Sequence, residues 1–327
     1  MATVSVSPTN KASLMLVSEA GLGAGMEPDS RLLERSIDWS SGASDQSRGN
    51  QLSGTLPPLV APHLIDLIVA NNKLTGTVPN AIYSLPHVYR VDLGGNRLTG
   101  KIPAPTDATL PLRMLFLDNN QLTGSLPVLT SAQQILVLDI SDNQLSGSVP
   151  LFGLSAAGPA ALEYAARYLS LDASYGCAMD IDFADNPLTG ALPSWLLSFP
   201  LEDIDASNCS FSEALPDTAF QGAWLKRINF SFNRLSGSIS NALTSFAMQG
   251  MQLANNSLTG TLPVGLAGFT SLDTLDVSFN SLTGQLPEEL GTLGSLDTLI
   301  VQGSGLASGR MQNSLKQYLP SWLQFDM

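Results

Sequence analysis

The chain has little of the material from which most catalytic and metal sites are built. Its 327 residues include two cysteines and two histidines. Two cysteines cannot form a disulfide framework or a four-ligand zinc site, and two histidines leave little for acid/base or metal chemistry. The sequence therefore predicts a protein that is not an enzyme and that carries neither a metal nor another cofactor.

Charged residues are also scarce, and positive ones most of all. They make up 13% of the chain, with 28 acidic and 15 basic side chains and a net charge of −13. Because this charge repels phosphate backbones and anionic lipid headgroups, nucleic acid and membrane surfaces are not expected as partners. A basic protein or peptide is the expected partner. The apolar share of 44% is ordinary and predicts a folded chain.

Long hydrophobic runs are absent as well. No stretch approaches the roughly 18 apolar residues that a bilayer-spanning helix needs, so direct membrane insertion by this chain is not predicted. The N-terminus lacks a basic segment followed by an apolar core, so no signal peptide is visible. Two interpretations of this remain open: the protein is cytoplasmic, or the sequence lacks its true start.

One motif is abundant. The pattern Asn-x-Leu-Ser/Thr-Gly-x-Leu/Ile/Val-Pro begins at eight positions: Asn50, Asn72, Asn96, Asn120, Asn143, Asn186, Asn256 and Asn280. Degenerate copies begin at Cys209, Asn233 and Ser304. Successive anchors are 22 to 24 residues apart except between Asn143 and Asn186 (186 − 143 = 43). The chain is therefore a repeat array with one insertion.

Before most anchors stands Leu-x-x-Leu-x-Leu, as in Leu272, Leu275 and Val277 before Asn280. Its alternation is typical of a short strand with one buried face, which is stable only against its neighbours. The Gly and Pro that follow disfavour a regular helix on the return path. The sequence predicts an α/β solenoid, a curved stack of about 10–11 repeats of 23–24 residues, with a parallel concave sheet and a mostly irregular or 3-10 convex side.

The anchor residue has a physical role of its own. At the turn that follows each strand, an amide side chain can donate to and accept from backbone groups that would otherwise be unpaired. We expect stacked anchors to form a structural ladder, with the cysteine as a small buried substitute: Asn72, Asn96, Asn120, Asn143, Asn186, Cys209, Asn233, Asn256 and Asn280.

These motifs resemble the leucine-rich repeat family, in its plant-type subclass with the pattern Leu-x-x-Leu-x-Leu-x-x-Asn-x-Leu-Thr/Ser-Gly-x-Leu/Ile-Pro. Residues 50–306 carry the resemblance. The subclass includes plant receptor kinase ectodomains, polygalacturonase inhibitors and surface antigens of trypanosomatid protozoa. The resemblance implies an extracellular or cell-surface location and a role in recognition.

The sequence divides into a solenoid and its flanks. Residues 1–30 have no periodicity and are interpreted as a disordered leader, and residues 31–49 as a degenerate N-terminal cap. The solenoid spans 50–306, with an insertion at about 151–177. Residues 307–327 carry apolar side chains at helical spacing and are predicted to form a C-terminal capping helix.

Candidate binding residues lie between the buried positions of the strands or directly before the anchors. The acidic ones are Asp139, Asp142, Asp180, Asp182, Asp185, Asp203 and Asp205. Adjacent repeats place Asp182 and Asp205 roughly 5 Å apart, which costs free energy unless a cation or a basic partner compensates. The alternative is that these aspartates only solvate the face. Phe232 and Phe279 are either aromatic hot spots on this face or part of a second core spine.

The preferred hypothesis is a receptor-like or antigen-like recognition module that binds a protein or peptide, with basic side chains, on its acidic concave face. Two alternatives remain open. The chain could be a secreted inhibitor of a hydrolase, or the ligand-sensing fragment of a receptor kinase.

Overall fold

The structure is a computed structural model. It describes residues 3–6, 12–17, 53–56, 59, 64–105, 112–128, 135–150, 179–193, 196, 201–216, 225–241, 247–306 and 324–326. The chain forms two compact units, one from Met1–Leu145 with Phe152–Ala157 and one from Ser146–Leu151 with Gly158–Met327. The predicted cap at 31–49 and the predicted insertion at 151–177 both lie wholly outside the described residues.

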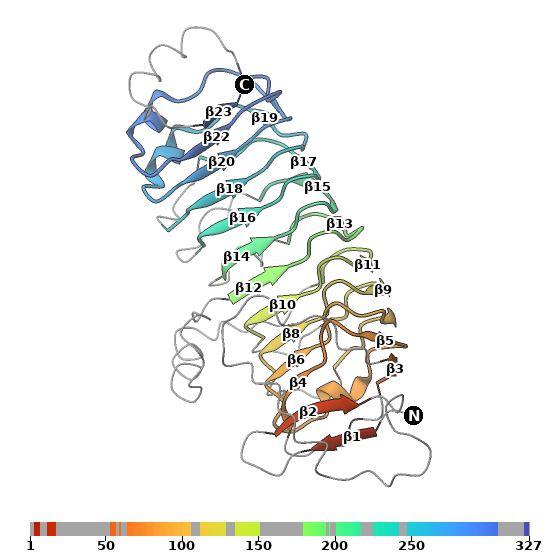
Figure 1. The fold of residues 1–327 in the computed structure, drawn as a ribbon. Helices are drawn as coiled ribbons and strands as arrows, with labels where there is room; N and C mark the ends of the chain where they lie inside the picture. Colours follow the sequence, from red (N-terminus) through yellow and green to blue (C-terminus); the bar gives the residue numbers. More distant parts are fainter. Residues whose placement is uncertain are drawn as a thin grey trace. The chain divides into compact units, whose positions relative to one another are not determined.

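The first unit is built on one row of strands (Figure 1). In spatial order these are β1 (Thr3–Val6), β2 (Ala12–Val17), β4 (Leu64–Ile68), β6 (Arg90–Asp92), β8 (Met114–Phe116) and β10 (Val137–Asp139). β1 and β2 pair antiparallel, and the later neighbours pair parallel. Opposite residues on β4 and β6 are Asp66 and Arg90, 24 positions apart (90 − 66 = 24), so each repeat adds one strand.

The second unit repeats this arrangement with parallel strands only. In spatial order these are β12 (Met179–Asp182), β14 (Leu201–Asp205), β16 (Arg227–Asn229), β18 (Gly250–Gln252), β20 (Thr274–Asp276), β22 (Thr298–Ile300) and β23 (Gln324–Asp326). The parallel solenoid predicted from the sequence is therefore confirmed.

A second set of short strands forms where the chain leaves the anchors. In the first unit these are β3 (Ser53–Thr55), β5 (Lys73–Thr75), β7 (Thr99–Gly100), β9 (Gln121–Gly124) and β11 (Gln144–Leu145). In the second they are β13 (Thr189–Gly190), β15 (Ser210–Ala214), β17 (Arg234–Ser236), β19 (Thr259–Gly260) and β21 (Ser281–Leu282). They pair in short parallel sheets of two or three strands.

The convex side carries 3-10 helices: η3 (Asn80–Tyr83), η5 (Val264–Gly268) and η6 (Glu288–Thr292). Each follows a proline, since Pro79, Pro263 and Pro287 stand at their N-caps. Within the described ranges no α-helix is found, which agrees with the predicted irregular or 3-10 side.

The core of each repeat consists of the apolar positions of the motif. In the repeat of β20, Leu272, Leu275 and Val277 are fully buried, and so is Leu258 of the preceding repeat. Because every strand is too short to bury its own apolar face, this core exists only as a stack.

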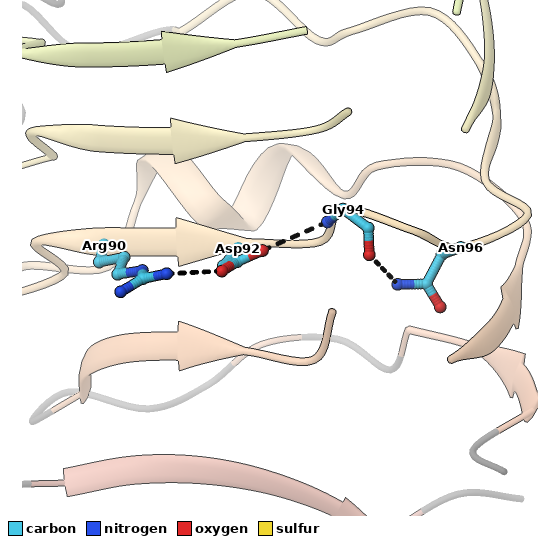
Figure 2. Close-up of polar contacts among 4 residues, drawn as sticks. All are labelled: Arg90, Asp92, Gly94 and Asn96. Atoms are coloured by element: carbon cyan, nitrogen blue, oxygen red, sulfur yellow. Dashed lines mark hydrogen bonds and ion pairs between the residues drawn. The ribbon is translucent and has the colours of Figure 1, made fainter. Parts of the chain in front are cut away.

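The anchor residues connect adjacent repeats by hydrogen bonds. Asn96 accepts a hydrogen bond from Leu74 N–H (3.0 Å) in the preceding repeat, and its Nδ2 donates to Val69 O (3.0 Å), Leu93 O (3.0 Å) and Gly94 O (3.2 Å). Figure 2 shows the last of these bonds. The side chain is buried and thus satisfies backbone groups that water cannot reach.

The same pattern recurs at other anchors, including the degenerate repeat of Asn233 and, in part, that of Cys209. Asn120, Asn143, Asn233, Asn256 and Asn280 each make hydrogen bonds both to their own turn and to the preceding repeat. Asn72 and Asn186 donate to their own turns. Cys209 Sγ donates to Phe183 O (3.4 Å), which replaces one of the bonds an asparagine Nδ2 makes.

The structure differs from expectation at the two ends. Where a disordered leader was predicted at 1–30, β1 and β2 are present, and β2 pairs with β4 of the first repeat. Where a helix was predicted at 307–327, residues 324–326 form β23, which pairs parallel with β22. In both cases the terminal segment uses backbone groups of an otherwise open sheet edge. Residues 307–323 lie outside the described part of the chain.

Candidate functional site

The open face of the main sheet is made by side chains that flank the buried position of each strand. On β6, Val91 is buried, while Arg90 and Asp92 on either side are partly exposed. This alternation repeats on β10, β20 and β22. The predicted candidates Asp139, Asp180, Asp182, Asp203 and Asp205 all lie on strands of this face, Asp139 in the first unit and the others in the second.

Four of these carboxylates form two facing pairs in the second unit. The parallel register of β12 and β14 sets Asp180 opposite Asp203 and Asp182 opposite Asp205. Oδ1 of Asp180 and Oδ1 of Asp203 are buried and accept no hydrogen bond from the described residues. Burial and the charge of Asp203 raise the pKa of Asp180. This arrangement is costly unless a cation or a proton compensates.

Two cations of the next repeat, one at the start of β16 and one directly before it, compensate part of this charge. Arg227 on β16 faces Asp203, with its Nη1 3.5 Å from Asp203 Oδ2. Lys226 forms an ion pair with Glu202. Around β12, β14 and β16 there are thus five carboxylates, those of Asp180, Asp182, Glu202, Asp203 and Asp205, against these two cations.

On five strands, the aspartate at the end of the strand has a structural role that the sequence did not reveal. Asp182 Oδ1 accepts from Ala184 N–H (2.9 Å), and Asp205 Oδ1 accepts from Ser207 N–H (2.8 Å). The same bond, from the backbone N–H two residues later, recurs at Asp92, Asp139 and Asp276. Figure 2 shows it at Asp92, whose other oxygen accepts from Arg90. These aspartates hold the turn after the strand, whether or not they bind a ligand.

Aspartates also gather in the first unit, around Asp118. Burial, together with the charges of Asp139, Asp92 and Asp142, raises the pKa of Asp118 to about 6. A β-carbon on Gly94 would collide with Asp118 Oδ1, so the carboxylate lies directly against the backbone of the neighbouring repeat.

Asp118 makes the stability of the first unit depend on pH. Its pKa in the folded state, about 6, is above its ordinary value of 3.8, so the charged form disfavours folding above pH 6. This penalty disappears as the pH falls from 6 to below 3.8. We expect Asp118→Asn to stabilise the protein by about 1 kcal/mol at pH 7, after allowance for solvent screening. Urea denaturation at several pH values should show this gain shrinking between pH 6 and pH 4, and a gain independent of pH would contradict it.

A second row of candidates lies just beyond the strands. Asp142, Asp185, Phe232 and Phe279 each stand directly before an anchor position, with φ of 52°, 55°, 58° and 50°. The equivalent residues of the other repeats are also left-handed: Asn71, Gly95, Asn119, Asn208, Asn255 and Gly303. We call these ten residues the left-handed row. Asp142 and Asp185 therefore belong to the turn at the edge of the sheet and not to its open face.

The two phenylalanines of this row are exposed. Phe232 is 57% exposed and Phe279 is 50% exposed, so neither belongs to a core spine. The buried phenylalanines among the described residues are different ones: Phe183, Phe211, Phe230 and Phe269. Of the two interpretations left open by the sequence, the structure excludes the core spine.

Other chemistry has little support among the described residues. They contain no group of three or more His, Cys, Asp or Glu side chains that could hold a metal ion. Burial raises the pKa of the Cys209 thiol to about 12, which makes it a poor nucleophile. No helix in the described part of the chain has the length and hydrophobicity needed to cross a membrane.

Comparison with known proteins identifies the repeat. The family model for the leucine-rich repeat matches residues 224–246 and 271–293. No curated protein matches the chain. Among solved structures, the ectodomain of the receptor kinase GASSHO1/SCHENGEN3 from Arabidopsis thaliana, in complex with CASPARIAN STRIP INTEGRITY FACTOR 2, is 28% identical. Its TM-score is 0.64, over 84% of this chain and 34% of that one.

Two further structures extend this comparison. The ectodomain of the Arabidopsis receptor kinase HAESA, in complex with an extended IDA peptide hormone, is 27% identical, with a TM-score of 0.65 over 78% of this chain and 40% of that one. A plant ice-binding protein is 24% identical, with a TM-score of 0.59 over 79% of this chain and 81% of that one, and supports the fold alone. The chain spans less than half the length of the two receptor ectodomains.

Proposed function

Because the chain is a leucine-rich repeat protein, we propose that it is a non-enzymatic recognition module that binds a basic protein or peptide on the open face of its main sheet. The observation that carries this proposal is the two pairs of facing carboxylates on β12 and β14. Five carboxylates against two cations leave a local negative charge, which basic side chains of a ligand would compensate.

The comparisons support the peptide part of this proposal. Two receptor ectodomains with the same repeat architecture are described in complex with a peptide hormone or a protein factor. This similarity supports the proposal that the protein acts outside the cell or at its surface. The hydrolase-inhibitor and receptor-kinase alternatives would use a similar face, and no particular residue favours either of them.

The double variant Asp182→Asn, Asp205→Asn tests the proposal. Asparagine keeps an oxygen that can accept the hydrogen bonds from Ala184 N–H and Ser207 N–H, so the turns are preserved while two charges are removed. Isothermal titration with an arginine-rich heptapeptide should show the affinity falling by at least about tenfold.

A matched control separates this site from the net charge of the chain. Asp273→Asn, Asp297→Asn removes the same charge beside β20 and β22 and should leave the affinity within about twofold. Equal losses in the two double variants would show nonspecific attraction to an acidic protein. Unchanged binding in both would remove the support for the site on β12 and β14.

A further inference from the structure

In the second unit the left-handed row alternates in chemical character. From β12 to β20 it runs Asp185, Asn208, Phe232, Asn255 and Phe279. An acidic residue and two phenylalanines thus occupy every second repeat, and asparagines stand between them. These residues lie in the turns after the strands, so the alternation does not involve the side chains of the open face.

The phenylalanines are unusual at these positions. Eight of the ten residues in the row are Asn, Asp or Gly, the types that adopt a positive φ readily, whereas a bulky side chain adopts it rarely. Burial of the ring does not offset the backbone strain at either phenylalanine, since both side chains are at least half exposed. Backbone strain combined with an exposed aromatic ring is typical of binding sites.

At two places in the second unit, neighbouring members of the row touch one another. A β-carbon on Gly303 would lie 2.9 Å from Phe279 Cδ1, so the Phe279 ring rests against the backbone of the next repeat. Asn208 Nδ2 donates to Asp185 Oδ1. The side chain of Asn255, between the two phenylalanines, is not fully buried and makes no hydrogen bond to the described residues. Asn255 stands in the repeat between those of Phe232 and Phe279, so along the row a polar amide separates the two exposed rings.

The spacing of the row selects one ligand geometry. Members two repeats apart are separated by two strand spacings, about 10 Å. One turn of a polyproline II helix is three residues with a rise of about 9.3 Å, and it presents every third side chain on the same face. An α-helix advances about 10.8 Å in two turns, but its intermediate turn would place a further side chain over Asn255, between the two rings.

We propose that the row from Asp185 to Phe279 binds a segment in the polyproline II conformation. Two apolar side chains three residues apart contact Phe232 and Phe279, and a basic side chain three residues further pairs with Asp185. The Asn255 amide donates to a backbone carbonyl of the segment, which has no internal hydrogen bonds. The proposal deepens the proposed function and rests on it only in that the ligand is a peptide.

The experiment uses the full chain and two synthetic peptides, Arg-Pro-Pro-Leu-Pro-Pro-Leu and its reverse, because a polyproline II ligand can bind in either direction. At least one of them should bind the wild-type protein, and a version with glycine in place of proline should bind more weakly. Phe232→Asn, Phe279→Asn should weaken binding by at least about 30-fold. The same change should not lower the thermal midpoint, since asparagine suits a positive φ.

Val264→Asn is the control, because Val264 is a similarly exposed apolar residue (60%) on η5, outside the row. It should leave the affinity unchanged. Equal loss in the control, or no loss in the double phenylalanine variant, would overturn the proposal. So would sedimentation showing a dimer that only the phenylalanine variant dissociates, since a second copy would then cover the rings.

These outcomes are distinguishable from failure of the proposed function. Asp182→Asn, Asp205→Asn leaves the row intact, so it should not abolish binding of the polyproline peptides. If this variant also binds the arginine-rich heptapeptide as tightly as the wild type does, the acidic face is excluded as the binding site. The proposal for the row is not affected by that result. If the double aspartate variant loses heptapeptide binding and the wild type binds neither polyproline peptide, the proposal for the row is wrong. The proposal for the acidic face then still holds.

Discussion

Replacing Asn120 by alanine is expected to lower the free energy of unfolding by about 3 kcal/mol or more. Asn120 Oδ1 accepts from Leu98 N–H (2.9 Å), and Nδ2 donates to Leu93 O (3.1 Å), Leu117 O (3.1 Å) and Asp118 O (2.9 Å). The site is buried, so alanine leaves backbone groups of two repeats without partners, each costing about 1–3 kcal/mol. Urea denaturation followed by far-UV circular dichroism measures the loss.

The next residue supplies the control. Gln121 is exposed on β9, and Gln121→Ala should change the free energy of unfolding by less than about 0.5 kcal/mol. Similar effects of the two substitutions would mean that the amide ladder does not connect the repeats energetically. A large effect of Asn120→Ala alone would show that repeat stability depends on contacts with the preceding repeat, as expected for a solenoid.

The fold could be predicted from the sequence because its determinants are local and repeated. Positions such as Leu272, Leu275 and Asn280 recur at fixed spacing, and each has a single physical role, either burial or satisfaction of a turn. Even Cys209 could be placed correctly, since its position in the repeat determines its surroundings. Stacking then leaves one arrangement in which every unit buries its apolar face.

The ends of the sheet could not be predicted in the same way. β2 and β23 lie outside the repeat, and each pairs with a strand through backbone groups, which carry no side-chain pattern. Their sequences, Ala12–Val17 and Gln324–Asp326, share no motif with the strands they join. A prediction based on periodicity has no information at these positions.

The candidate site could be predicted only in part. The sequence identified the outward aspartates of β12 and β14, but not that Asp182 and Asp205 hold the turns that follow. That role depends on the direction of a backbone N–H two residues later, which the side-chain pattern does not reveal. For the same reason Asp142 and Asp185 were assigned to the open face, whereas their positive φ places them beyond it.

Phe230 and Phe232 show how strongly position in the repeat decides the effect of a phenylalanine. Phe230 is fully buried, whereas Phe232, two residues later, is 57% exposed with a φ of 58°. Phe230→Ala removes a buried ring and leaves a cavity, so we expect the free energy of unfolding to fall by about 3–5 kcal/mol. Phe232→Asn removes an exposed ring and relieves backbone strain, so we expect no loss and a gain of up to about 1 kcal/mol.

Both variants can be compared with the wild type by urea denaturation under the same conditions. The contrast tests the basis of the binding proposal. If Phe232 lowers the stability of the protein, its presence at an exposed turn is not explained by folding, and a ligand contact would explain it. If Phe232→Asn destabilised the protein as much as Phe230→Ala, the Phe232 ring would be a packing residue. Its exposure could then no longer support a ligand contact.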